Sequence, residues 1–257
     1  MLKQSKPTFS IVVPLFNEEE NIDLLVQNIF SHIGTDPQFL EIILVDDGSR
    51  DETGSRALNL AKQDARVKLI RHESNQGLGA AIRTGLKAVA GDLVLYTDAD
   101  LPFDFSLIPQ LIAEAGESCV VAGYRLNRGE GARRLLLTKG YNALIRLFFG
   151  LTLRDVNFAC KIMPKSFLDK AIFNSDGSFI DVEILLESKR LGLTINEQPL
   201  VYYPRTRGLS TLSRPRVILY ILKEMIGYRA TPFLKQTSFL PRSRKFLQKS
   251  LKLKISG

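Results

Sequence analysis

Apolar and polar positions in the first part of the chain alternate between two periods. Short runs rich in β-branched and aliphatic residues predict strands at 9–14, 41–45 and 67–71, and a fourth from 94. Between them, apolar residues recur at helical spacing and predict helices at 22–33, at about 51–64 and at about 75–89. Strands that alternate with helices are typical of βαβ units, which form a mostly parallel sheet with helices on both faces. The pattern therefore predicts an α/β fold.

The second half continues this pattern less regularly. Helices are predicted at 107–115, 133–149 and 181–191, a strand at 119–123 and an extended stretch at 193–203. The sequence contains no internal repeat and no low-complexity linker. We expect one main domain over residues 1–212, followed by a distinct extension over residues 213–257.

The extension differs from the main domain in charge. Residues 1–200 hold 22 Lys and Arg against 26 Asp and Glu, whereas residues 201–257 hold 13 against one. An apolar helix is predicted at 216–229 and a basic amphipathic helix at 242–255. Such a pair suits the plane of an anionic membrane surface. The alternative is a helix that packs on the core, followed by a solvated arm.

The composition is typical of a soluble globular protein. The 257 residues are 45% hydrophobic and 24% charged, with a net charge of +8, and no apolar run approaches the roughly 20 residues of a membrane-spanning helix. The N-terminus lacks the apolar core of a signal peptide, and Cys119 and Cys160 form no disulfide framework or zinc spacing. We expect a cytoplasmic protein, peripheral at the membrane. Because residues 1–200 are not basic, no nucleic-acid partner is expected.

Two aspartates, Asp98 and Asp100, follow the strand that begins at Val94, and Pro102 stops that strand. Side chains at i and i+2 of an extended backbone point to the same side, so these carboxylates are predicted to converge. They would repel each other without a cation, and hard oxygen ligands suit Mg²⁺ or Mn²⁺ held together with a substrate's phosphates. Taken alone, such a pair is more often an ordinary acidic turn.

Two more polar motifs follow predicted strands. Residues 14–18 follow the first strand, and Asp46 and Asp47 follow the second. Ligands of open α/β sheets bind at the carboxyl ends of the strands, where a carboxylate can accept hydrogen bonds from a base or a ribose. For the motif at Asp46 and Asp47, the alternative role is capping of the next helix. Three motifs are thus expected at one edge of the sheet.

Other residues give weaker signals. Gly77 and Gly79 lack the remaining residues of a dinucleotide or phosphate loop, so they indicate tight helix–sheet packing rather than phosphate contact. The chain has two histidines, His32 and His72. Neither is expected near a site motif.

In combination, the motifs resemble the signature of glycosyltransferase family 2, whose members share the GT-A fold. The stretches that carry the resemblance are 12–18, 45–51, 75–79 and 97–101. The chain resembles more narrowly the dolichyl- or polyprenyl-phosphate sugar synthases, because their later segments are similar to 123–125, 155–161 and 205–210. The resemblance spans about residues 9–212 and implies that these form a GT-A catalytic domain.

The resemblance implies a role for each matching residue. The donor nucleoside would be held by Pro14, Phe16, Glu18, Val45, Asp46 and Asp47. The metal ion and the diphosphate would be held by Asp98, Asp100 and the backbone of Ala99. Arg205 would contact the diphosphate or the acceptor phosphate, and Arg125 would lie on the acceptor side of the donor site.

The chain also departs from the mannose synthases of this family. Pro102 stands where they have a metal-binding glutamine, and Thr211 where they have a lysine. Asn157 and Lys161 replace the serine-glycine and the arginine of their acceptor segment. These departures leave the sugar, the base and the acceptor open.

The implied reaction is an inverting, metal-dependent transfer of a hexose from a GDP-mannose or UDP-glucose type of donor to a polyprenyl phosphate. Asp100, through the metal, and Arg205 would stabilise the leaving diphosphate, and an anionic acceptor phosphate needs no strong base. A hydroxyl acceptor would need a carboxylate base, for which Asp155 is the candidate. A non-catalytic module that binds a nucleotide sugar or a membrane is the remaining alternative. Participation of a membrane-protein partner is left open.

Overall fold

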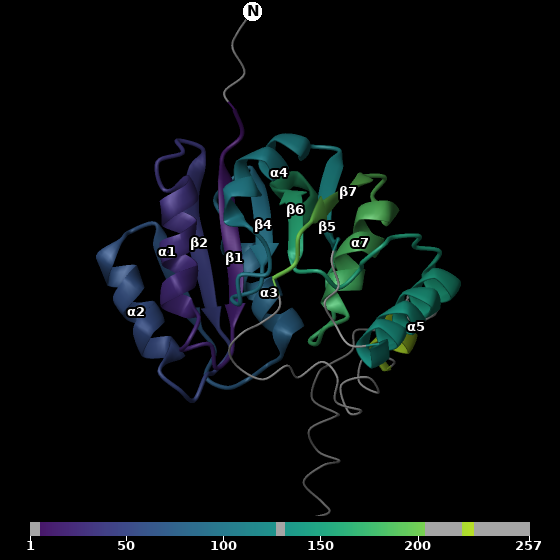
Figure 1. Cartoon of the computed structure of the whole chain (residues 1–257), viewed down its shortest axis with the longest axis horizontal. Coiled ribbons are helices and arrows are strands. Elements are labelled where there is room, and N and C mark those ends of the chain that lie inside the picture. The colour runs from purple at the N-terminus through teal and green to yellow at the C-terminus, as the bar shows by residue number, and fades with distance from the viewer. Residues whose placement is uncertain (1–5, 127–131, 204–222, 229–257) are drawn as a thin grey trace, which may run out of the picture.

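A seven-stranded sheet forms the centre of the computed structural model (Figure 1). The structure describes residues 6–126, 132–203 and 223–228, the side chains of 132–139 excepted. The strands are β1 (Phe9–Leu15), β2 (Phe39–Asp46), β3 (Val67–Arg71), β4 (Leu93–Thr97), β5 (Cys119–Arg125), β6 (Cys160–Pro164) and β7 (Thr194–Leu200). Their order across the sheet is β3-β2-β1-β4-β6-β5-β7.

Helices cover both faces of the sheet (Figure 1). One face packs against α1 (Ile22–Ile33), α2 (Thr53–Gln63), η1 (Phe105–Leu107) and α4 (Ile108–Glu114). The other packs against α3 (Leu78–Ala88), α6 (Lys165–Leu168) and α7 (Ile180–Arg190). Alternate residues of β1 supply the two cores, with Ile11 and Val13 toward α1 and Val12 toward α3. A third cluster joins α5 (Ala132–Phe149) to α7 and Met225.

The predicted mostly parallel α/β sheet is confirmed. β1 pairs in parallel with β2 and β4, and β2–β3 and β5–β7 are also parallel. The sequence prediction missed β6, which runs antiparallel between β4 and β5. A lysine at the second position of this strand, Lys161, interrupts the apolar pattern that marks a buried strand. The lysine is buried all the same, because Asp181 of α7 pairs with it.

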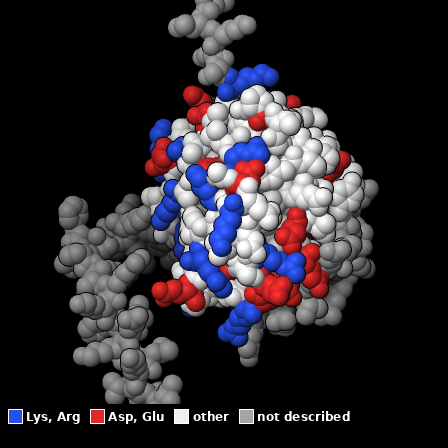
Figure 2. Space-filling model, turned by 90° about the vertical axis from the view of Figure 1, so that its left-hand side faces the viewer, with Lys and Arg blue, Asp and Glu red and all other residues white. Residues whose placement is uncertain are grey.

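The surface near α2 carries charges of both signs (Figure 2). Arg56 forms ion pairs with Asp23 at 2.7 Å and with Glu52 at 3.1 Å, and Arg66 pairs with Asp64 at 2.8 Å. Arg56 and Arg66 on this face are therefore each balanced by a nearby acid. This agrees with the near balance of charge over residues 1–200.

A buried carboxylate, Glu41, ties together the amino ends of several strands. It accepts hydrogen bonds from the Ser10 hydroxyl at 2.9 Å and the Ala90 amide at 2.7 Å, and it pairs with Lys68 of β3. Burial alone would raise the pKa of Glu41, but the bonds from Lys68, Ala90 and Ser10 outweigh it and hold the pKa below its usual value. The ionised form of Glu41 therefore stabilises the fold.

Replacing Glu41 by Gln should lower the free energy of unfolding at pH 7 by about 1–3 kcal/mol. Because the pKa of Glu41 is depressed in the folded state, its contribution is full above the usual pKa of 4.5 and is lost as the pH falls through the folded value. Urea unfolding of both proteins at pH 7 and near pH 4 measures this difference. The exposed Glu52→Gln serves as the control and should change little at either pH. A Glu41→Gln deficit that persists unchanged at low pH would contradict the assignment.

Candidate active site

The carboxyl ends of β1 and β2 are joined by hydrogen bonds between the loops that follow them. The amide of Asn17 donates to Ser49 Oγ at 3.0 Å, and the amide of Arg50 donates to Asn17 Oδ1 at 3.0 Å. The amide of Glu18 donates to Thr53 Oγ1 at 2.8 Å. These bonds hold two of the predicted motifs together at the lower edge of the sheet in Figure 1.

Left-handed backbone occurs at two non-glycine positions among the described residues, and both belong to the motif loops. Asn17 has φ of 56° and Leu101 has φ of 52°. Such residues are strained unless their surroundings hold them, and they concentrate at functional sites. Leu101 directly follows Asp100, so the strain lies beside the predicted metal site.

The two aspartates of the third motif lie beyond the strand. β4 ends at Thr97, and Ala99 and Asp100 form a turn, so the prediction of a continuous extended backbone is wrong here. The carboxylates are nevertheless close. Burial, then the charge of Asp100, and then that of Asp181 raise the pKa of Asp98 to about 7, and Lys161 opposes them. The turn itself brings them together, with Ala99 buried in the core below.

A cation fits this donor set. The charge of Asp100 raises the pKa of Asp98, so a positive charge beside this pair is favoured, and the hard carboxylate oxygens match Mg²⁺ and Mn²⁺. No group of three His, Cys, Asp or Glu side chains suited to a metal occurs in the part of the chain that the structure describes. The oxygens of a substrate diphosphate and of water are suitable further ligands for a metal at Asp98 and Asp100.

Buried polar groups lie behind Asp98. The Tyr96 hydroxyl lies 3.3 Å from Asp98 Oδ1, and Lys161 Nζ lies 5.7 Å from the centre of the Tyr96 ring. Lys161 Nζ also donates to the carbonyl of Phe158 at 2.9 Å and pairs with Asp181. The sequence placed Lys161 in the acceptor segment but did not predict its pairing with Asp181 behind Asp98, since β6 and α7 are distant in the chain.

Arg125 and Asp155 form one buried pair. Arg125 Nε lies 2.7 Å from Asp155 Oδ2, and a second guanidinium nitrogen lies 3.1 Å from Oδ1. The two side chains are 10% and 1% exposed. The sequence assigned them separate roles, whereas the structure brings them together. To act as a base, Asp155 would have to leave this forked ion pair.

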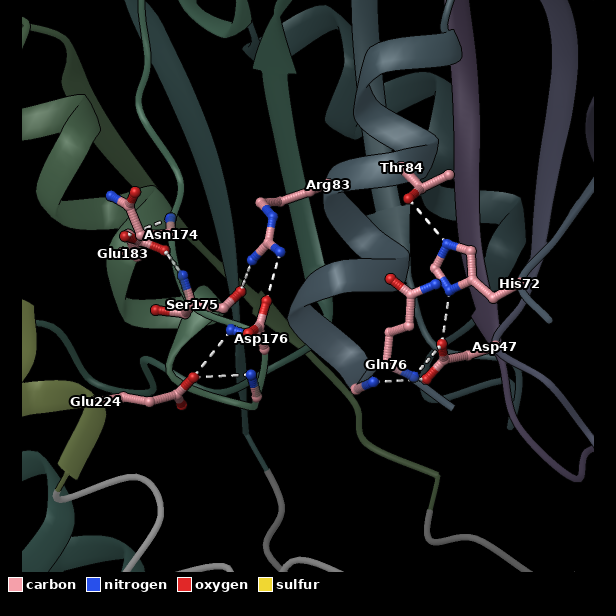
Figure 3. Close-up of polar contacts among 12 residues, drawn as sticks. Asp47, His72, Gln76, Arg83, Thr84, Asn174, Ser175, Asp176, Glu183 and Glu224 are labelled. Carbon is pink, nitrogen blue, oxygen red and sulfur yellow. Dashed lines mark hydrogen bonds and ion pairs between the residues drawn. The ribbon is translucent and has the colours of Figure 1, made fainter. Parts of the chain in front are cut away.

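Asp46 and Asp47 both accept hydrogen bonds from the protein. Asp46 is fully buried, accepts the Ser49 amide at 2.9 Å and pairs with Arg71 Nε at 3.0 Å. Asp47 accepts the amides of Gln76 and Gly77, both at 2.8 Å (Figure 3). Asp46 thus fixes its own turn, and Asp47 fixes the start of α3.

The prediction that neither histidine lies near a site motif is wrong. His72 Nδ1 lies 2.7 Å from Asp47 Oδ1, and Nε2 lies 3.0 Å from Thr84 Oγ1 (Figure 3). A carboxylate only accepts, so Nδ1 carries the proton and donates it to Asp47. The signal that could have found His72 is its place directly after β3, the parallel neighbour of β2.

His32 lines a cavity of about 380 Å³ beside Asp100, together with Leu24, Phe103 and Tyr203.

The other residues predicted to hold the donor nucleoside lie at the same edge of the sheet. Pro14 of β1 and Val45 of β2 are partners across the parallel pair, and Phe16 is 42% exposed just beyond β1.

The interpretation of Gly77 and Gly79 as closely packed is confirmed, but their partner is a loop and not the sheet. A Cβ on Gly77 would lie 2.3 Å from the Asp176 carbonyl oxygen, and one on Gly79 would lie 2.3 Å from that of Ser175. Gly77 also has φ of 100°, which disfavours any side chain.

Several predicted features lie outside the described residues. They are Arg205 with the rest of 205–210, the helix at 242–255, and most of the helix at 216–229. Residues 223–228 of that last helix are described and are helical. None of the helices in the described ranges is long and apolar enough to cross a membrane.

The sequence profile of glycosyl transferase family 2 matches residues 10–172. The chain belongs to glycosyltransferase family 2. Dodecaprenyl-phosphate galacturonate synthase of Rhizobium johnstonii is 31% identical over 235 residues, which cover 87% of this chain and 68% of that protein.

Two further family relatives are more partial matches. Dolichyl-phosphate beta-glucosyltransferase ALG5A of Trichomonas vaginalis is 31% identical, with 74% of this chain and 64% of that protein covered. Glycosyltransferase AglD of Haloferax volcanii is 28% identical, with 76% of this chain and 33% of that protein covered. The chain thus spans less than two thirds of the length of these two proteins.

Solved structures of glucosyl-3-phosphoglycerate synthase from Mycobacterium tuberculosis share the fold. The complex with phosphoglyceric acid has a TM-score of 0.66 and 26% identity, covering 85% of this chain and 80% of that one. The complex with Mn²⁺, UDP-glucose and phosphoglyceric acid has a TM-score of 0.65 at the same identity and coverage. The predicted GT-A fold is confirmed.

The Arg125–Asp155 pair should contribute strongly to the stability of this glycosyltransferase. Replacing Asp155 by Ala removes a carboxylate that makes two contacts with the buried Arg125 guanidinium, and it should lower the free energy of unfolding by about 3 kcal/mol. Asp155→Asn keeps one oxygen that can accept from Arg125 and should cost less. Urea unfolding measures both, with the exposed Asp169→Ala as the control. Equal stability of Asp155→Ala and the wild type would show that the pair is unimportant.

Proposed function

We propose that this protein transfers a hexose from a nucleoside-diphosphate sugar to a polyprenyl phosphate with the aid of Mg²⁺ or Mn²⁺. The observation that carries the proposal is the turn at 98–100. It places two mutually repelling carboxylates at the sheet edge that also holds Asp47 and Glu18. A site of this kind suits a diphosphate that arrives with a divalent cation.

The comparisons support the substrate classes. Two of the relatives carry a dodecaprenyl or dolichyl phosphate in their names. The synthase from Mycobacterium tuberculosis was solved with Mn²⁺ and UDP-glucose together. We extend these classes to the present chain, with the sugar and the nucleoside left open between the UDP and GDP types.

Asp47 is suited to hold the nucleoside. A carboxylate has about four acceptor positions, and three on Asp47 are taken by Gln76, Gly77 and His72. The position that remains, on Oδ2, can accept an N–H of a base or a ribose hydroxyl. Because its other partners fix the carboxylate, Asp47 is oriented before the donor binds.

Asp98 and Asp100 would hold the metal, which would neutralise charge on the leaving diphosphate. Lys161 lies behind them and limits the repulsion between the carboxylates. Leu101 and the buried Ala99 keep the turn in place. Arg205 stays a prediction, with the role of contacting the diphosphate or the acceptor phosphate.

An acceptor phosphate fits the described site better than a hydroxyl does. A phosphate oxygen is already anionic at neutral pH, so it can form the bond to the anomeric carbon as the bond to the diphosphate breaks. This single displacement inverts the anomeric configuration and needs no protein base. A hydroxyl acceptor needs a protein base. The candidate base, Asp155, is held in an ion pair with Arg125.

The assay combines the purified protein, Mn²⁺ or Mg²⁺, and radiolabelled UDP-glucose or GDP-mannose with one of two acceptors. Polyprenyl phosphate is supplied in vesicles with anionic lipid or in neutral detergent, and phosphoglyceric acid serves as the hydroxyl acceptor. We expect label in the organic phase with one donor, and more of it from anionic vesicles if the basic extension contacts the membrane. In Asp100→Asn, transfer should fall about a hundredfold or more.

The control is Asp92→Asn, at the opposite end of β4, which should retain transfer. Label that moves to phosphoglyceric acid but not to the lipid would replace the lipid-phosphate acceptor by a hydroxyl. Transfer that survives both Asp100→Asn and removal of divalent cations would overturn the metal assignment.

A further inference from the structure

The loop at 174–177 is held by charged side chains from three helices (Figure 3). From α7, the fully buried Glu183 accepts the amides of Asn174 and Ser175, both at 2.9 Å. This loop precedes α7 and contains no motif of the family signature. Its position is nevertheless fixed as firmly as that of the motif loops.

The α3 side contributes a cation and close packing. Arg83 donates to the carbonyl of Ser175 and to the carboxylate of Asp176, the latter at 2.5 Å. The Gly79 amide donates to the Asp176 carbonyl at 2.9 Å. With no room for a Cβ at Gly77 or Gly79, the loop and the start of α3 cannot move independently.

The helical residues 223–228 contribute the third contact. Glu224 Oε1 accepts the amides of Asp176 at 3.0 Å and Gly177 at 2.8 Å (Figure 3). Met225 is buried, and the Tyr228 ring lies 5.9 Å from Phe149 and 5.8 Å from Phe179 between ring centres. This segment is therefore docked on the body by both packing and a carboxylate.

The contacts form a continuous path from Glu224 to the donor site. Glu224 fixes the amides of the 174–177 loop, that loop contacts Gly77 and Gly79, and the amides of Gln76 and Gly77 hold Asp47. Each step of this path is either a hydrogen bond or a close contact between two backbone segments. A shift of the loop would thus reach the carboxylate that orients the nucleoside.

We propose that Glu224 is a positioning residue for donor binding, acting on Asp47 through the 174–177 loop and the start of α3. The proposal rests on the proposed function, since it takes Asp47 to hold the nucleoside. It gives the predicted C-terminal extension a part in donor binding. Loss of the Glu224 contacts should weaken nucleotide binding although Glu224 does not touch the nucleotide.

The test compares Glu224→Leu, which removes the acceptor, with Glu224→Gln, which keeps an oxygen able to accept both amides. Calorimetric titration with UDP and GDP, each with Mn²⁺, should show binding about threefold weaker or more in the Leu variant. The Gln variant should bind like the wild type. In the transfer assay, KM for the donor should rise in the Leu variant while KM for the lipid acceptor does not.

A second measurement keeps the proposal testable if Glu224→Leu does not fold. Arg83→Met breaks the same path on the α3 side and must then weaken nucleotide binding in the same way. Amide hydrogen exchange at Gln76 and Gly77 should also be faster in whichever variant folds, and unchanged in Glu224→Gln.

The outcomes separate the two proposals. Wild-type nucleotide affinity in Glu224→Leu, or in Arg83→Met where that variant is used, overturns the positioning role. Normal nucleotide binding by the wild type without sugar transfer to a lipid overturns only the acceptor. A wild-type protein that binds neither nucleotide overturns both.

Discussion

Repulsion between the carboxylates of Asp98 and Asp100 is the constraint on which the site depends. Burial strengthens it, because fewer water molecules screen the two charges. Lys161 offsets part of it from behind, but Asp181 pairs with that lysine and adds a negative charge of its own. The turn and its surroundings therefore carry more negative than positive charge. A cation that arrives with a diphosphate would supply the missing charge, which couples metal binding to donor binding.

The fold keeps this turn at its place by constraints at both ends of the strands. Glu41 ties the amino ends of β1 and β2 to β3 and to the turn before β4. At the carboxyl ends, hydrogen bonds join the loops after β1 and β2, and two residues there adopt left-handed backbone. A rigid sheet therefore carries the site on loops that have little freedom. Such loops keep the carboxylates near each other at the cost of local strain.

The sequence predicts the strands and helices of the first half well, because their apolar periods are regular and each motif follows a strand. It also places Asp98, Asp47 and Glu18 at one edge, since parallel strands end together. It misses β6, where Lys161 disrupts the apolar pattern and only a residue 20 positions later explains its burial. His72 and the 174–177 loop are missed for a related reason. Their partners come from other elements, and no local pattern encodes those contacts.

The proposed function depends on binding of a metal together with a nucleoside diphosphate by the carboxylate pair Asp98 and Asp100. Electron paramagnetic resonance of Mn²⁺ measures the free ion directly during a titration of the protein. We expect Mn²⁺ to bind about tenfold more tightly or better when UDP or GDP is present, since the protein supplies few of the ligands. The tighter binding should vanish in Asp98→Asn. Equal Mn²⁺ affinity with and without nucleotide, or unchanged binding in Asp98→Asn, would contradict the claim.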